Sequence, residues 1–160
     1  MLSPWLVVLL AAAPDPAACL PVPVEVAAQG DQAVVAHRAQ LATKNPKAPT
    51  PRGAPTDALP LLQLVWSVAS KASEPSALRW LMEPEFTWSF GGDASAEQAV
   101  EAWAKDPALL KKLKAAAAGP CKAVDSAGTP TLTCAAKRGP RLVLAKKDGC
   151  WRWTAFVEGD

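Results

Sequence analysis

Proline is distributed unevenly along this chain, and this distribution limits where regular structure can form. Ten of the 16 prolines lie at or before Pro60, whereas six of the seven tryptophans follow it. Proline lacks a backbone N–H and moves the preceding residue towards extended conformations, so it disfavours helix interiors and central strands. A segment of about 100 residues can bury one workable core. We therefore predict a single folded domain over residues 56–160.

An apolar run at residues 5–13 stops at Pro14. A membrane-spanning helix needs about 20 apolar residues, so this run has the length of a signal-peptide core instead. No Lys or Arg precedes it, which leaves an apolar strand or buried helix as the alternative. We expect residues 1–19 to be a signal peptide and the protein to be exported to the periplasm or envelope.

Cys19 follows Ala17 and Ala18, an arrangement that resembles the lipobox of bacterial lipoproteins. In that pattern the cysteine receives the lipid, and an aliphatic residue stands where this chain has Pro16. Two outcomes stay open: a lipid anchor at Cys19, or ordinary cleavage close to it. The lipid would be the only expected attachment to a membrane.

Residues 20–55 are rich in proline and alanine. We expect them to form a partly disordered tether, with polyproline character and flexibility over residues 44–55. A small hairpin around residues 29–31 and disorder are the alternatives for the part between the signal and this stretch.

The first half of the domain carries helix signals. Residues 58–72 show a period of 3.6 residues, with Asp57 as the expected N-cap. Ser95 with Gln98 is a capping box, and Asp106 before Pro107 begins a further helix. The predicted elements are helices at 58–72, 76–82, 95–104 and 107–118, and a strand at 85–90.

The last forty residues alternate as strands do. We predict strands at 121–126, 131–136, 141–147 and 150–157, with Asp148-Gly149 as a two-residue hairpin turn. In that register one face carries Leu142, Leu144, Trp151, Trp153 and Val157. The predicted fold is therefore α+β: amino-terminal helices packed on a curved antiparallel β-meander, in two layers.

The cysteines allow a disulfide to be predicted. Cys121 and Cys134 lie symmetrically about Ala127-Gly128, so a regular hairpin places them opposite each other. Cys134 and Cys150 would be two strand spacings apart, roughly 9.5 Å, which is too far for a bridge. We predict Cys121–Cys134, with Cys150 either free or paired with Cys19; three unpaired buried cysteines are the alternative.

Two motifs carry a family resemblance. Residues 86–92 (Phe-Thr-Trp-Ser-Phe-Gly-Gly) and the closing residues 148–160 resemble a group of uncharacterised exported proteins of Gram-negative bacteria. The ending is also similar to the last strand of the nuclear-transport-factor-2-like (SnoaL-like) cone. The resemblance implies helices on a curved sheet with a concave apolar interior, and it implies no activity.

Few groups suited to catalysis are present. The only histidine, His37, lies in the amino-terminal third, where we expect it to be exposed, and the chain has no tyrosine. Glu85 and Asp93 are the candidate carboxylates for an enzyme of the cone fold. The cysteines are too widely spaced for a metal clip, and the net charge of +2 requires no nucleic-acid partner. We expect no metal, no cofactor and no enzymatic activity.

Binding features are more suggestive. Trp88, Trp103 and Trp153 could line a cavity for an apolar ligand or form the core. Residues 137–152 hold six basic side chains and one acidic, a pattern that fits an anionic partner or a solvated sheet edge. We therefore expect an exported, non-catalytic accessory domain that binds a partner protein or an apolar small ligand. A cone-fold enzyme with a cavity carboxylate and a purely structural envelope protein are the alternatives.

Overall fold

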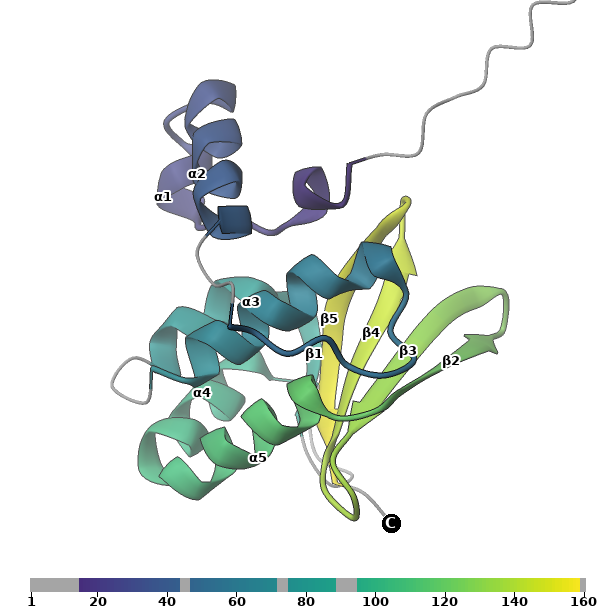
Figure 1. Cartoon of the computed structure of the whole chain (residues 1–160). Helices are drawn as coiled ribbons and strands as arrows, with labels where there is room; N and C mark the ends of the chain where they lie inside the picture. Colours follow the sequence, from purple (N-terminus) through teal and green to yellow (C-terminus); the bar gives the residue numbers. More distant parts are fainter. Residues whose placement is uncertain (1–14, 44–46, 72–74, 89–94, 159–160) are drawn as a thin grey trace, which may run out of the picture.

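Helices lie against one face of a five-stranded sheet (Figure 1). The computed structural model describes residues 15–43, 47–71, 75–88 and 95–158. The strand order is β1-β5-β4-β3-β2, and the helices α3, α4 and α5 pack on the sheet. The predicted α+β class with two layers is confirmed.

The helices begin where the sequence places their caps, with one exception. The helix α4 spans Ala96–Lys105, and Ser95 accepts a hydrogen bond from the Gln98 N–H at 3.1 Å. In the same way Asp106 accepts from the Ala108 N–H at the start of α5, Pro107–Ala118. The exception is Asp57, which lies in the short 3₁₀ helix η2 (Thr56–Ala58) and does not cap α3, Leu59–Ala69. The predicted helix at 76–82 is a 3₁₀ helix, η3, Pro75–Leu81.

The meander follows the predicted strands closely. It consists of β2 (Cys121–Ser126), β3 (Thr129–Ala135), β4 (Arg141–Lys147) and β5 (Cys150–Val157), joined as consecutive antiparallel neighbours. Asp148-Gly149 and Ala127-Gly128 both have positive φ angles, as a two-residue type I′ turn requires. Two-residue turns thus join β2 to β3 and β4 to β5, and the five residues 136–140 join β3 to β4, so strands that follow one another in the sequence are neighbours in the sheet.

A register shift alters one end of the sheet. Leu144 pairs with Trp153 and Lys146 with Trp151, as predicted, but Leu142 pairs with Phe156. The extra residue in β5 is a bulge, and it exchanges the faces of the residues that follow it. Phe156 is therefore buried in the core, and Val157, which was predicted to face the helices, is only half-buried.

The sheet is mixed and not purely antiparallel. The strand β1, Met82–Trp88, lies beside β5 and runs parallel to it. The expectation that the sheet is an antiparallel meander alone is therefore wrong at this edge. Helical residues connect β1 to the meander, and a connection of that length allows parallel pairing.

The described part of the amino-terminal third is helical. The short helices η1 (Pro16–Cys19) and α1 (Val24–Ala27) precede α2, Asp31–Thr43, so the hairpin considered around residues 29–31 is not found. Alanine has the highest intrinsic helix propensity, and it recurs along α2, which favours the helix. The helices α1 and α2 lie beside the domain, away from the sheet, whereas η1 contacts β5 (Figure 1).

Residues 47–55 run over the domain surface and contact it. Pro51 is buried, and the Arg52 carbonyl accepts a hydrogen bond from the Cys121 N–H at 2.7 Å. Gly53 has a φ of +82° and approaches the backbone of Cys121 so closely that a Cβ atom would not fit. This part of the expected flexible tether is therefore bound to the edge of β2. Residues 44–46 lie outside the described residues.

Candidate functional site

The three tryptophans singled out as ligand candidates lie together. Trp103 and Trp153 are 1% and 0% exposed, and their rings stack with centroids 5.8 Å apart. Trp88 is half-buried and contacts Trp103 edge to face at 5.3 Å. Because these rings contact one another directly, the cluster is part of the hydrophobic core. A role in binding stays a prediction.

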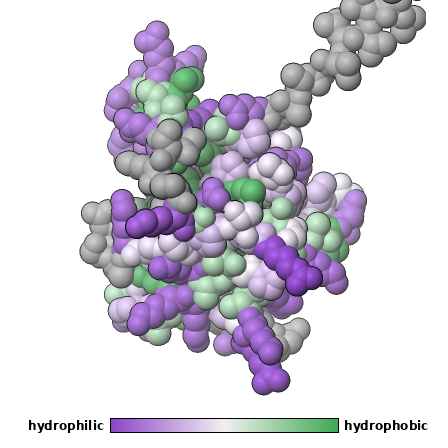
Figure 2. Space-filling model, in the orientation of Figure 1, coloured by the Kyte–Doolittle hydropathy of each residue, from purple (hydrophilic) through white to green (hydrophobic). Residues whose placement is uncertain are grey.

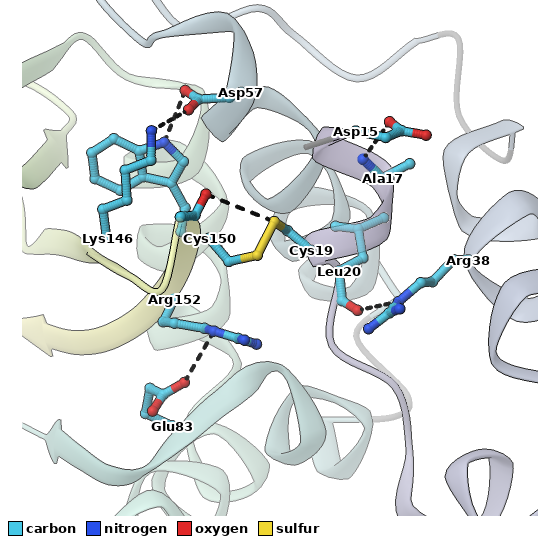
Figure 3. Close-up of a disulfide and its surroundings, with 12 residues drawn as sticks. Asp15, Ala17, Cys19, Leu20, Arg38, Asp57, Glu83, Lys146, Cys150 and Arg152 are labelled. Carbon is cyan, nitrogen blue, oxygen red and sulfur yellow. Dashed lines mark hydrogen bonds and ion pairs between the residues drawn. A yellow bond between two sulfur atoms is a disulfide. The ribbon is translucent and has the colours of Figure 1, made fainter. Parts of the chain in front are cut away.

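All four cysteines form disulfides. Cys121 and Cys134 are directly opposite each other on β2 and β3, with Cα atoms 4.0 Å apart, and their predicted bridge is confirmed. The second bridge joins Cys19 to Cys150, across 131 residues of sequence, with Cα atoms 5.2 Å apart (Figure 3). Two disulfides are typical of proteins in a non-reducing compartment.

The second bridge bears on the lipid anchor. The Cys19 sulfur is bonded to Cys150, and one sulfur atom cannot carry both a disulfide and a thioether-linked lipid. Leu20, the next residue, is 2% exposed, and its carbonyl accepts a hydrogen bond from Arg38 Nε at 2.8 Å. Of the two states that the sequence left open for Cys150, free or paired with Cys19, the structure has the pairing.

Asp57 joins the start of α3 to the β4–β5 hairpin beside this bridge (Figure 3). Its carboxylate accepts hydrogen bonds from Trp151 Nε1 at 2.9 Å and from Lys146 Nζ at 2.7 Å. Partial burial alone would raise the pKa of Asp57, but these hydrogen bonds and the Lys146 charge together outweigh it and lower the pKa. Asp57 thus links η2 to the hairpin, while Ala58 takes the N-cap position of α3 without a side-chain hydrogen bond.

The other side of the hairpin carries a second charge cluster. Glu83 of β1 forms ion pairs with Lys147, at 3.7 Å, and with Arg152, at 3.9 Å. The sequence suggested that the basic residues 137–152 guard a sheet edge. This interpretation is wrong for the hairpin, since β4 and β5 lie inside the sheet and several of these charges are paired.

The sheet face opposite the helices is less covered than the core face. Alternate residues of the three inner strands point to this face, and they are half-buried, unlike their neighbours in the core. Most have small side chains: Thr131, Thr133, Val143, Ala145 and Ala155. We call this surface the second face. It is a broad surface of small residues with charged residues around it.

The expected catalytic candidates gain little support from the geometry. Glu85 is exposed on β1, and Asp93 lies outside the described residues. Among the residues described, no charged side chain is buried and no group of three metal-binding side chains is found. No helix in the described ranges is long and apolar enough to span a membrane.

His37 differs from the expectation that it is exposed. It is half-buried, and its ring lies edge to face with Trp80, with centroids 5.9 Å apart. Its Nε2 atom is buried and has no hydrogen-bond partner within the described part of the chain. The histidine thus helps to seat α2 on η3, a contact across 43 residues that no local pattern indicates.

Comparisons with known proteins give no further identification. No protein-family profile matches the chain, and neither the curated proteins nor the solved structures contain a match. The resemblance to exported Gram-negative proteins and to the cone fold therefore stays a prediction. What the chain does has to be inferred from its own geometry.

Proposed function

We propose that this chain is an exported, non-catalytic accessory domain that binds a partner protein. The single observation that carries export is the pairing of all four cysteines, because such bridges form and persist outside the reducing cytosol. The bridge between Cys19 and Cys150 supports it further, since it stabilises the segment directly behind the apolar run.

A partner protein is favoured over an apolar small ligand. The tryptophans that would line a ligand cavity are in contact with one another and nearly fully buried. The surface is instead a mosaic, and Figure 2 shows hydrophilic and apolar side chains interspersed over the face in view. A mixed surface has the composition of a transient protein interface, whereas an apolar small ligand needs a concave and mostly apolar pocket.

Expression of the full chain in a Gram-negative host tests export. We expect fractionation to place it in the periplasm, and intact mass to show that the apolar run at residues 5–13 is removed while Cys19 is retained. Alkylation before reduction should modify none of the four cysteines. A full-length, reduced chain in the cytosol would overturn the proposal. A lipid on Cys19 would mean that the protein is anchored to a membrane and that the bridge between Cys19 and Cys150 does not form.

Binding of an apolar fluorescent probe distinguishes a domain that binds a partner protein from one that binds an apolar small ligand. We expect tryptophan fluorescence to be unchanged when an anilinonaphthalene sulfonate dye is added to the folded protein. The same dye added to a Trp103→Ala variant provides a control, because that substitution opens a cavity in the core. Saturable quenching in the unmodified chain would favour the small-ligand alternative.

A further inference from the structure

The strand β2 is an edge strand with an exposed outer side. It is last in the strand order and pairs only with β3 in the sheet (Figure 1). Every residue from Lys122 to Ser126 is exposed, and Val124 is 47% exposed. Unpaired N–H and C=O groups on such an edge are a template for a further strand.

The register shows which backbone groups point outward. Ser126 and Thr129 flank a two-residue turn, so they form a hydrogen-bonded pair. From there along β2, the backbone N–H and C=O groups of successive residues point alternately towards β3 and away from it. Lys122 and Val124 therefore bond to β3, whereas Ala123 and Asp125 point away from it. Pro130 is consistent with this alternation. It has no N–H, and it lies opposite Asp125 in a non-hydrogen-bonded pair, where β3 donates no N–H to β2.

One end of this outer edge is already occupied. Cys121 also points outward, and its N–H donates to the Arg52 carbonyl at 2.7 Å. In the described part of the chain, no backbone partner is found for the outward groups of Ala123 and Asp125. The available edge is therefore short, with two outward-facing residues on either side of Val124.

We propose that this edge pairs with β2 of a second copy of the chain, antiparallel and about a two-fold axis, with Val124 opposite Val124. A two-fold axis through an antiparallel pair makes the contact self-complementary. Three registers centred on this edge satisfy the symmetry: residues 123, 124 or 125 can lie opposite themselves. The structure excludes two of them.

Centring on Ala123 would place Cys121 opposite Asp125 in a hydrogen-bonded pair, but the Cys121 N–H is bonded to Arg52. Centring on Asp125 would place two like charges directly opposite each other, which is destabilising. It would also need extended backbone at Ala127, which has a φ of +51° in the turn. Neither register is compatible with the fold as it stands.

Centring on Val124 uses only the available groups. Ala123 of each copy then pairs with Asp125 of the other, and Lys122 lies opposite Ser126, so no like charges meet. The two Val124 side chains form a non-hydrogen-bonded pair, which brings cross-strand side chains closest together. So short a pairing buries less than the about 1,200 Å² of a standard interface, so we expect a dimer that dissociates readily on dilution.

Cysteine cross-linking tests the register. Opposed residues have Cβ atoms about 4.5–5.5 Å apart, so a Val124→Cys variant should oxidise to a covalent dimer at high protein concentration. Ser126→Cys is the matched control on the same strand and face, and it should stay monomeric because its two copies would lie about 13 Å apart. Peptide mapping checks that both native disulfides persist. Equal cross-linking of the two variants, or none in either, would overturn the proposal.

Sedimentation velocity tests the edge without a new thiol. Ala123→Pro removes only an outward-pointing N–H, a position where edge strands tolerate proline. We expect it to abolish the concentration-dependent dimer, while Ala123→Thr, which keeps the N–H, preserves it. Circular dichroism checks that both variants are folded. A dimer that survives Ala123→Pro, or an unmodified chain that is monomeric at millimolar concentration, would contradict the proposal. This inference is independent of the proposed export, whose test is the thiol state and the cleavage site.

Discussion

At the scale of single residues, Ala127 is not the residue type that best suits the backbone conformation of the β2–β3 turn. Ala127 has a φ of +51°, in the left-handed region that residues other than glycine, asparagine and aspartate rarely adopt. The equivalent position of the β4–β5 turn is Asp148, with a φ of +52°. The two turns share a geometry, but only the second has a residue type that favours it.

We therefore expect Ala127→Asn to stabilise the protein by about 1 kcal/mol, because the left-handed conformation costs an alanine about that much. Urea unfolding measures the change. Ser126→Asn is the control, since it adds the same side chain next to the turn in extended backbone and should give no gain. A destabilised Ala127→Asn variant would show that the turn differs from the type I′ conformation.

At the scale of elements, Asp57 fixes the start of α3 to the β4–β5 hairpin. Its pKa is lowered in the folded protein from an ordinary value near 3.8. A carboxyl group with a lowered folded pKa contributes stability above its unfolded pKa, and this contribution is lost as the pH falls through the folded pKa. The stabilising effect is thus present at neutral pH and disappears below about pH 4.

Asp57→Asn should remove this part of the pH dependence. We expect the free energy of unfolding to fall less steeply between pH 5 and 2, roughly the range over which such a carboxyl group titrates. At pH 7 the loss should be about 1 kcal/mol or less, because Asp57 and Lys146 are each about one third exposed and solvent screens the pair. Asp125→Asn, at an exposed position, is the control. Parallel pH profiles for the unmodified chain and Asp57→Asn would contradict the assignment.

At the scale of the whole molecule, the Cys19–Cys150 bridge ties the amino-terminal helices to the end of the β4–β5 hairpin. We expect the double variant Cys19→Ser/Cys150→Ser to lose about 2–4 kcal/mol of stability, the usual range for a native disulfide. Limited proteolysis should then cut residues 20–43 first, while residues 59–157 stay protected. Cys121→Ser/Cys134→Ser is the matched control, since it should destabilise the sheet without releasing the helices. Unchanged protection of residues 20–43 would mean that Leu20, Arg38 and His37 hold them without the bridge.

The sequence by itself determined the features that depend on neighbouring residues. The strands of the meander, the Asp148-Gly149 turn, the caps at Ser95 and Asp106 and the bridge between Cys121 and Cys134 all follow from periodicity and turn chemistry within about 14 residues. Only the tertiary structure decided the rest: the parallel pairing of β1 with β5, the bulge that buries Phe156, the hydrogen bond between Asp57 and Trp151 and the bridge between Cys19 and Cys150. The paired residues are 68 to 131 positions apart in the sequence, and the bulge depends on which side chain fills the core. Such choices depend on packing that no local pattern encodes.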